Sequence, residues 1–197
     1  MRRRSVLALP AWAALGASQA RAAGTPVLTR VDTPLGAFVI AVDPAVAPVT
    51  VANYLAYVDA GLLDRGSVYR LVTLANQSAE TRFKIEVVQW GLNAADDAPT
   101  AFPPIRHETT RETGLQHLDG TVSMARNAPG SAAGEFFICI GAQPALDFGG
   151  GRNPDGQGFA AFGRVVEGMT TVRALHARAQ DKQFLPEPIA LRSVRRV

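Results

Sequence analysis

The sequence predicts a mainly-β domain, a closed antiparallel barrel or a sandwich, with two helices. Short apolar runs typical of strands recur along the chain, turn residues cluster between them, and only two stretches show helical spacing. A parallel α/β sheet would instead alternate strands with long helices. At 197 residues with 47% hydrophobic content, the chain is long enough for one domain with a full core.

The first 22 residues are typical of a cleavable secretory signal. Arginines at 2–4 precede an apolar run over 6–17, and Ala-Arg-Ala at 20–22 forms a small-x-small cleavage site. The run is too short to remain as a membrane span, and no cysteine follows the cleavage site to carry a lipid. We therefore expect a mature domain over 23–197, periplasmic or secreted and without a membrane anchor. Ordinary secretion and twin-arginine export both fit this segment.

The net charge of the mature domain does not favour nucleic-acid binding. Four of the 20 Lys and Arg residues lie at or before Arg21, whereas none of the 17 Asp and Glu residues does, so the mature net charge is about −1. The single cysteine, Cys139, lies in an apolar run, which indicates a small buried residue without a disulfide.

The mature chain begins with a hairpin and a helix. Residues 27–31 and 37–42 are short apolar-rich runs on either side of a Thr-Pro-Leu-Gly turn, which predicts a β-hairpin. Residues 43–61 then carry apolar side chains at helical spacing and end at Gly61, a helix stop signal.

Strands dominate the rest of the chain. They are expected at 67–72, 83–90, 121–126, 135–140, 159–166 and, closing the chain, 188–197. Residues 167–179 have helical spacing and predict the second helix. The connections 74–82, 92–120 and 147–158 are rich in Gly, Pro, Asn and Asp, so we expect irregular, mostly exposed loops.

Three of these strands place a distinctive side chain among apolar neighbours. Side chains two residues apart share a face of a strand, so Arg70, Gln89 and Phe137 each stand on a partly apolar face. Phe136 and Phe137 are adjacent, and only one of them can enter the same core. The pattern alone fits an ordinary sheet surface as well as a binding site.

Other chemistries find little support. The sequence lacks a GxSxG nucleophile motif, and its Gly-rich segment lacks the GK[ST] of a phosphate loop. The spacing of His107, Glu108, His117 and Asp119 matches no defensible metal-ligand pattern. We therefore predict no metal and no cofactor. A ligand-binding barrel is disfavoured because large inward residues such as Phe136 and Ile138 would fill its interior.

Five motifs together resemble the cyclophilin-type peptidyl-prolyl cis-trans isomerases. They are VYRLV at 68–72, VVQWG at 87–91, GTVSMARNAPGSAAGEFFICIG at 120–141, ALD at 145–147 and GFAAFGRVVEGM at 158–169. The resemblance extends over 26–197 and implies an eight-stranded closed antiparallel β-barrel capped by two α-helices, with its site on the outer surface. On this fold Phe136 enters the core and Phe137 faces the site.

The resemblance also implies roles for individual residues. Arg70 matches the catalytic arginine, which donates a hydrogen bond to the prolyl nitrogen as the X-Pro bond twists. The implied substrate-binding residues are Gln89, Val87, Ala125, Arg126, Glu135, Phe137, Leu146 and Phe159. Among these, the backbone of Ala125 matches the group that pairs with the residue preceding the proline. The implied partners are proline-containing polypeptides. We expect a monomer, because no long hydrophobic stripe lies outside the elements that need one for the core.

Several positions depart from the family pattern. Tyr69 replaces histidine, Glu86 an aromatic residue, Val87 a larger side chain and Ala145 a tryptophan or phenylalanine. The altered pocket suggests an alternative function, a catalytically weakened peptide-binding or chaperone protein on the same fold. Residues 73–83 and the GGGRNPDGQ segment resemble insertions that flank the groove.

Overall fold

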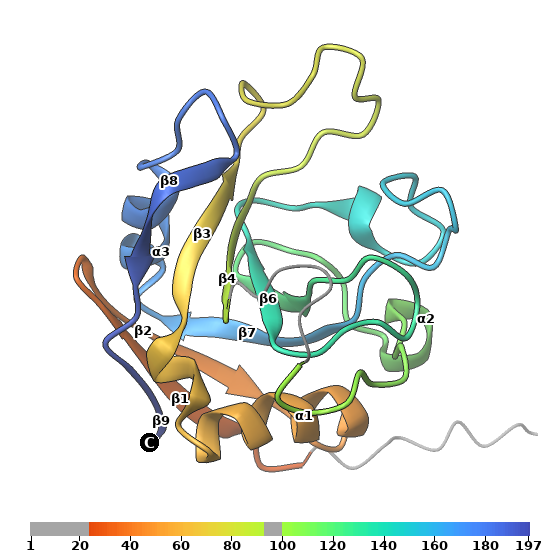
Figure 1. Cartoon of the computed structure of the whole chain (residues 1–197). Coiled ribbons are helices and arrows are strands. Elements are labelled where there is room, and N and C mark those ends of the chain that lie inside the picture. The colour runs from red at the N-terminus through yellow and green to blue at the C-terminus, as the bar shows by residue number, and fades with distance from the viewer. Residues whose placement is uncertain (1–23, 93–99) are drawn as a thin grey trace, which may run out of the picture.

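The computed structural model describes residues 24–92 and 100–197 (Figure 1). The signal segment expected at 1–22 lies outside the described residues. The strands are β1 (Val27–Thr33), β2 (Gly36–Val42), β3 (Ser67–Val72), β4 (Val87–Gly91), β5 (Thr121–Met124), β6 (Glu135–Cys139), β7 (Ala161–Glu167), β8 (Phe184–Ala190) and β9 (Ser193–Arg196). The helices are α1 (Pro48–Asp59), α2 (Thr110–Thr113) and α3 (Met169–His176), with 3-10 turns η1 (Leu62–Arg65) and η2 (Pro144–Leu146). The predicted hairpin and both predicted helices are confirmed.

The strands form one curled antiparallel sheet in the order β8-β3-β4-β6-β5-β7-β2-β1-β9. Within the described residues, the expected eight-stranded closed barrel with two helices is corrected in three respects: the sheet has nine strands, no ladder joins its two edges, and the short helix α2 is a third helix. The predicted strand 188–197 is divided between β8 and β9, because the chain bends at Leu191 and Arg192. The backbone amides of these two residues donate to the carbonyls of Gly66 and Asp32 at 2.9 and 2.8 Å. Two residues thus carry the chain from one sheet edge to the other.

Two prolines explain why the sheet ends at β8. Pro186 and Pro188 lack the backbone N–H that a further neighbouring strand would need. Strand β8 accordingly pairs with β3 alone. A strand bearing prolines at alternate positions is suited to an edge position.

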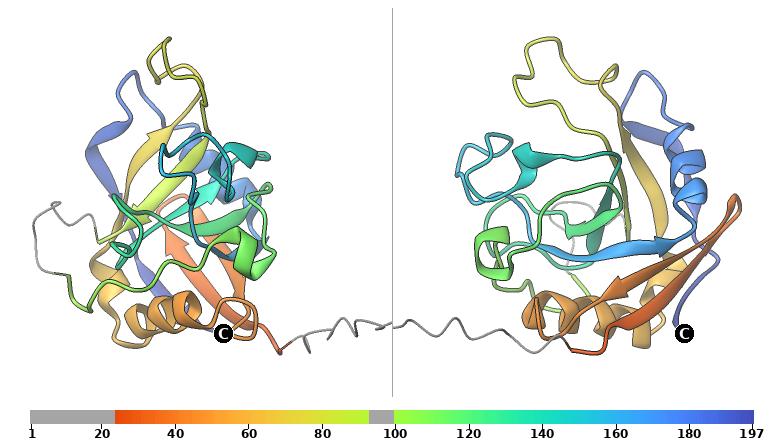
Figure 2. Two further views of the ribbon diagram at one scale, coloured as in Figure 1. Left: turned by 90° about the vertical axis from the view of Figure 1, so that its right-hand side faces the viewer. Right: turned by 180° about the vertical axis from the view of Figure 1, so that it is seen from behind.

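The predicted strand 83–90 is shorter than expected, and β4 begins only at Val87. The side chain of Gln77 forms hydrogen bonds with both backbone groups of Ile85. It accepts from the Ile85 amide at 3.2 Å and donates to the Ile85 carbonyl at 2.9 Å. Because these groups are occupied by a loop side chain, residues 83–86 do not extend the ladder. The segment between β3 and β4 projects in the half of the molecule away from α1 (Figure 2).

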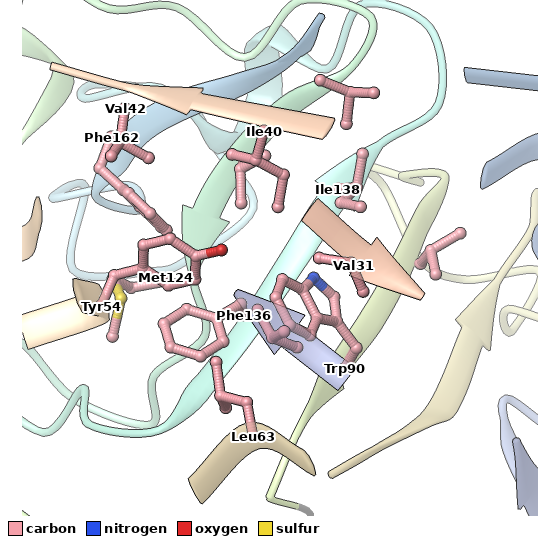
Figure 3. Packing of buried hydrophobic residues seen from close by; sticks show 14 of the residues in the cluster. Val31, Ile40, Val42, Tyr54, Leu63, Trp90, Met124, Phe136, Ile138 and Phe162 are labelled. Carbon is pink, nitrogen blue, oxygen red and sulfur yellow. The ribbon is translucent and has the colours of Figure 1, made fainter. Parts of the chain in front are cut away.

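The interior of the sheet is filled by large side chains (Figure 3). Trp90, Tyr54, Phe136 and Phe162 lie against one another with ring centroids 5.2–6.4 Å apart. The Tyr54 hydroxyl is satisfied by Thr29 at 2.7 Å. This packing leaves the sheet interior to side chains, as expected for a small barrel-like fold. In the described ranges no helix is long and apolar enough to cross a membrane.

Phe136 and Phe137 point to opposite sides, as strand alternation predicts. Phe136 and Ile138 belong to the main core, whereas Phe137 and Cys139 belong to a second apolar cluster on the other face of β6. Burial raises the pKa of the Cys139 thiol, consistent with its expected role as a small apolar residue.

Candidate active site

A hollow of about 540 Å³ lies on the face of β3, β4 and β6 that turns away from the main core. Every site residue implied by the resemblance lines it: Arg70, Val87, Gln89, Ala125, Arg126, Glu135, Phe137, Leu146 and Phe159. Residues from β3, β4 and β6 meet there because these strands are neighbours, with Gln89 paired to Arg70 on one side and to Phe137 on the other. The structure thus brings the predicted set together in one place.

The floor of the hollow is apolar. Phe137 packs with Val87, Leu146 and Ile85 in the second cluster, and its ring meets that of Phe159 in a T-shaped arrangement at a centroid distance of 5.4 Å. Glu86, which stands where the family has an aromatic residue, does not line the hollow, whereas the neighbouring Ile85 does. A flat apolar floor of this kind suits a small saturated ring that carries no hydrogen-bond donor.

Phe137 is supported from behind by a polar network that no sequence pattern indicates. The His117 ring stacks on Phe137 at 5.8 Å, with its Nδ1 2.7 Å from Asp147 and its Nε2 2.9 Å from the Ser123 hydroxyl. A serine, a histidine and an aspartate in this order can form a nucleophilic triad. Ser123 and His117 are buried, however, and neither lines the hollow, so the network supports the floor rather than a reaction.

Arg70 is held over the hollow by two amide oxygens. Its Nη1 donates to Gln89 at 2.9 Å, while its Nε and Nη2 donate to Gln183 at 3.1 and 2.6 Å. The guanidinium also lies 5.4 Å from the centroid of the Phe184 ring. Burial lowers the pKa of Arg70 below its ordinary value. Neutral oxygens orient the cation without cancelling its charge, so the charge stays available to a bound molecule.

Gln183 was missed in the sequence. It lies 113 residues from Arg70 in a loop before β8, and a lone glutamine in a loop carries no signal of a site. Only the pairing of β8 with β3 brings the loop to Arg70.

A chain of hydrogen bonds fixes the amide of Gln89. The Tyr69 hydroxyl lies 2.5 Å from the Glu135 carboxylate and donates its proton there, because an ionised carboxylate only accepts. The hydroxyl oxygen then accepts from Gln89 Nε2 at 2.7 Å, so Gln89 Oε1 points at Arg70. Burial, followed by the charge of Glu135, raises the pKa of Tyr69, which keeps its proton. Tyr69 and Glu135 thus act together to orient Gln89.

Arg126 has a buried side chain that binds the loop beside the hollow. Its guanidinium donates to the carbonyl of Gly158 and to both carboxylate oxygens of Asp155 at 2.8 and 3.0 Å, and lies 5.2 Å from the centroid of the Phe159 ring. The side chain has no exposed surface. Arg126 therefore anchors the loop 147–158 at the rim of the hollow.

The residues weighed as metal ligands have other partners. Glu108 accepts from the amides of Val49 and Thr50 at the start of α1, and Asp119 accepts from Gly141 and Arg173. Across residues 24–92 and 100–197, no group of three His, Cys, Asp or Glu side chains is placed to hold a metal ion.

Known proteins match this chain along nearly its whole described length. Residues 28–196 match the family described as cyclophilin type peptidyl-prolyl cis-trans isomerase/CLD. The chain is 31% identical over 172 residues to peptidyl-prolyl cis-trans isomerase cyp18 of Streptomyces antibioticus, covering 84% of this chain and 96% of that protein. It is 33% identical over 153 residues to peptidyl-prolyl cis-trans isomerase A of Dickeya dadantii, covering 77% and 72% respectively.

The fold also resembles that of a cyclophilin-type protein of known structure. A crystal structure of a cyclophilin type peptidyl-prolyl cis-trans isomerase of Cryptosporidium parvum superposes with a TM-score of 0.70 at 17% identity, covering 88% of this chain and 98% of that one. The family match, the curated relatives and the shared fold agree, and this chain belongs to the cyclophilin-type peptidyl-prolyl cis-trans isomerases.

Proposed function

We propose that this protein accelerates the rotation of X-Pro bonds in exported polypeptides through a hydrogen bond from Arg70 to the prolyl nitrogen. The observation that carries the proposal is the position of the Arg70 guanidinium, held by two neutral amides beside an apolar floor. The signal-like segment at 1–22 supports an exported location.

The reaction requires a twist and no covalent bond. Rotating an X-Pro bond breaks amide resonance against a barrier of about 18–20 kcal/mol. As the amide twists, the nitrogen lone pair is freed and becomes an acceptor. A donor aimed at that nitrogen binds the twisted state more strongly than the planar one, and only such differential binding lowers the barrier.

Different residues of the site hold the substrate proline, the residue before it and the nitrogen between them. The ring of the substrate proline lies on Phe137, Val87 and Leu146, which hold one side of the bond by apolar contact. Ala125 offers its backbone to the residue before the proline, as the family resemblance implies. Arg70, which cannot lose its proton near neutral pH, then donates to the nitrogen between them.

The direct test is the exchange rate of an Ala-Pro peptide measured by NMR with the wild type and Arg70→Ala. We expect the variant to lose about 10²–10³-fold in kcat/KM, the cost of removing one donor aimed at a transition state. Arg164→Ala removes an equal charge from an exposed position on β7 and serves as the control. Wild-type rates retained by Arg70→Ala would refute the arginine mechanism, and binding without acceleration by the wild type would indicate a peptide-binding protein.

The location has its own test. Expression of the full chain in a bacterium, followed by fractionation and mass spectrometry of the N-terminus, should find the protein outside the cytoplasm and beginning near residue 23. Intact protein confined to the cytoplasm would refute export.

A further inference from the structure

A second arginine, Arg152, lines the same hollow from the loop after η2. Two glycines precede it and allow the loop to pack closely: a Cβ at Gly150 would lie 2.5 Å from the carbonyl oxygen of Ala145, and one at Gly151 would lie 2.1 Å from the Phe83 ring. The amide of Arg152 then donates to the Ala145 carbonyl at 3.1 Å. The loop is therefore built to hold Arg152 at this rim.

Arg152 also joins the two loops that resemble insertions. Its Nη1 donates to Gln77 Oε1 at 3.2 Å and to the Phe83 carbonyl at 2.9 Å, both in the segment between β3 and β4. In the described part of the chain its Nε and Nη2 have no partner, and they remain free to bind a ligand. A guanidinium with two free donors is well suited to a carboxylate.

The charge of Arg152 is not cancelled locally. Among residues 24–92 and 100–197, no ion pair joins Arg152 or Arg70 to a carboxylate, whereas the third arginine of the hollow, Arg126, is paired with Asp155. Arg152 lies close enough to Arg70 for its charge to contribute to the lowered pKa of Arg70. Among the described residues, the lining of the hollow carries one carboxylate, that of Glu135, which accepts from the Tyr69 hydroxyl, so Arg70 and Arg152 together leave a net positive charge that an anionic ligand would relieve.

Strand register places Arg152 relative to a bound peptide. The amide of Ala125 donates to the carbonyl of Glu135, at the start of β6. Val87 pairs with Cys139 at the end of β6, and the chain before Val87 leads to Phe83, which Arg152 contacts. Ala125 and Arg152 therefore lie toward opposite ends of β6, with Phe137 between them. A peptide whose pre-proline residue pairs with Ala125 would extend its following residues toward Arg152.

We infer that the site prefers X-Pro substrates that carry an acidic residue directly after the proline, and that Arg152 binds that carboxylate. This inference rests on the proposed function, because the peptide direction is taken from the pairing at Ala125. Arg152 is then a specificity residue, and the two insertion-like loops serve to hold it in place.

The test compares Ala-Ala-Pro-Glu-Ala with Ala-Ala-Pro-Gln-Ala, which differ in one charge. For the wild type we expect kcat/KM to favour the glutamate peptide about fivefold, the scale of a partly exposed ion pair, and the ratio to fall as salt rises. Arg152→Gln should bring the ratio to about one, Arg152→Lys should keep part of it, and the exposed Arg164→Gln should leave it unchanged. Glu-Ala-Pro-Ala-Ala, with its charge before the proline, should show no such gain.

Titration of the same peptides followed by NMR gives the ratio of Kd values even if no peptide is isomerised, so failure of the inference is distinct from failure of the proposed function. Equal affinities for the glutamate and glutamine peptides would overturn the inference. So would a preference for glutamate that survives Arg152→Gln, or one that appears only for a carboxylate before the proline.

Discussion

Replacing Gln183 tests how the reacting arginine is oriented. The Gln183 side chain accepts from both Nε and Nη2 of Arg70, at 3.1 and 2.6 Å, and Gln89 accepts only from Nη1. In Gln183→Ala two of the three hydrogen bonds are lost. The guanidinium then turns about its remaining contact, and its donors spend less time aimed at the prolyl nitrogen.

The size of the effect follows from these contacts. A hydrogen bond from a charged donor contributes about 1.5–3 kcal/mol, but Arg70 is half-buried and water replaces part of what is lost. We therefore take about 2 kcal/mol as the cost of losing both contacts. At about 1.4 kcal/mol for each factor of ten, kcat/KM should fall about 30-fold. Because the apolar floor is untouched, the loss should appear in kcat, with KM changing by less than about twofold.

The assay is peptide exchange by NMR across a range of peptide concentrations, which separates kcat from KM. Gln180→Ala, an exposed glutamine in the same loop, is the matched control and should match the wild type. A folded Gln183→Ala protein with an unchanged kcat would refute the reasoning. So would a loss expressed wholly in KM, since that would indicate damage to binding instead of orientation.

Two other perturbations probe the surroundings of the site. Tyr69→Phe removes the hydroxyl that fixes the Gln89 amide, so kcat should fall about 3- to 10-fold in the same exchange assay. Circular dichroism should show that the variant keeps the fold. An unchanged kcat would show that Gln89 needs no such support. Asp155, whose pKa is lowered from 3.8 by hydrogen bonding to Arg126, should add stability above pH 4 that is lost as the pH falls through its folded pKa. Asp155→Asn should accordingly lower the urea unfolding free energy by about 0.5–1 kcal/mol at pH 7 and by less as the pH falls through the folded pKa of Asp155, and an equal loss at every pH would contradict the ion-pair explanation.

Much of the fold is predictable from local pattern. The hairpin, the two longer helices and the opposite burial of Phe136 and Phe137 follow from spacing along a few residues. Two of the failures arose where distant groups compete. Gln77 occupies the backbone of Ile85 and shortens β4, and the last strand divides because its two halves pair with different neighbours.

The sequence by itself determined which side chains share a face within one strand, such as Val87 with Gln89 and Phe137 with Cys139, because a strand has a two-residue period. Tertiary structure alone decided what surrounds them. Gln183 reaches Arg70, and Arg152 reaches the hollow, from loops far along the chain, and no local periodicity records where a loop will end in space. The net charge of the hollow and the orientation of the Arg70 guanidinium therefore depend on the tertiary fold.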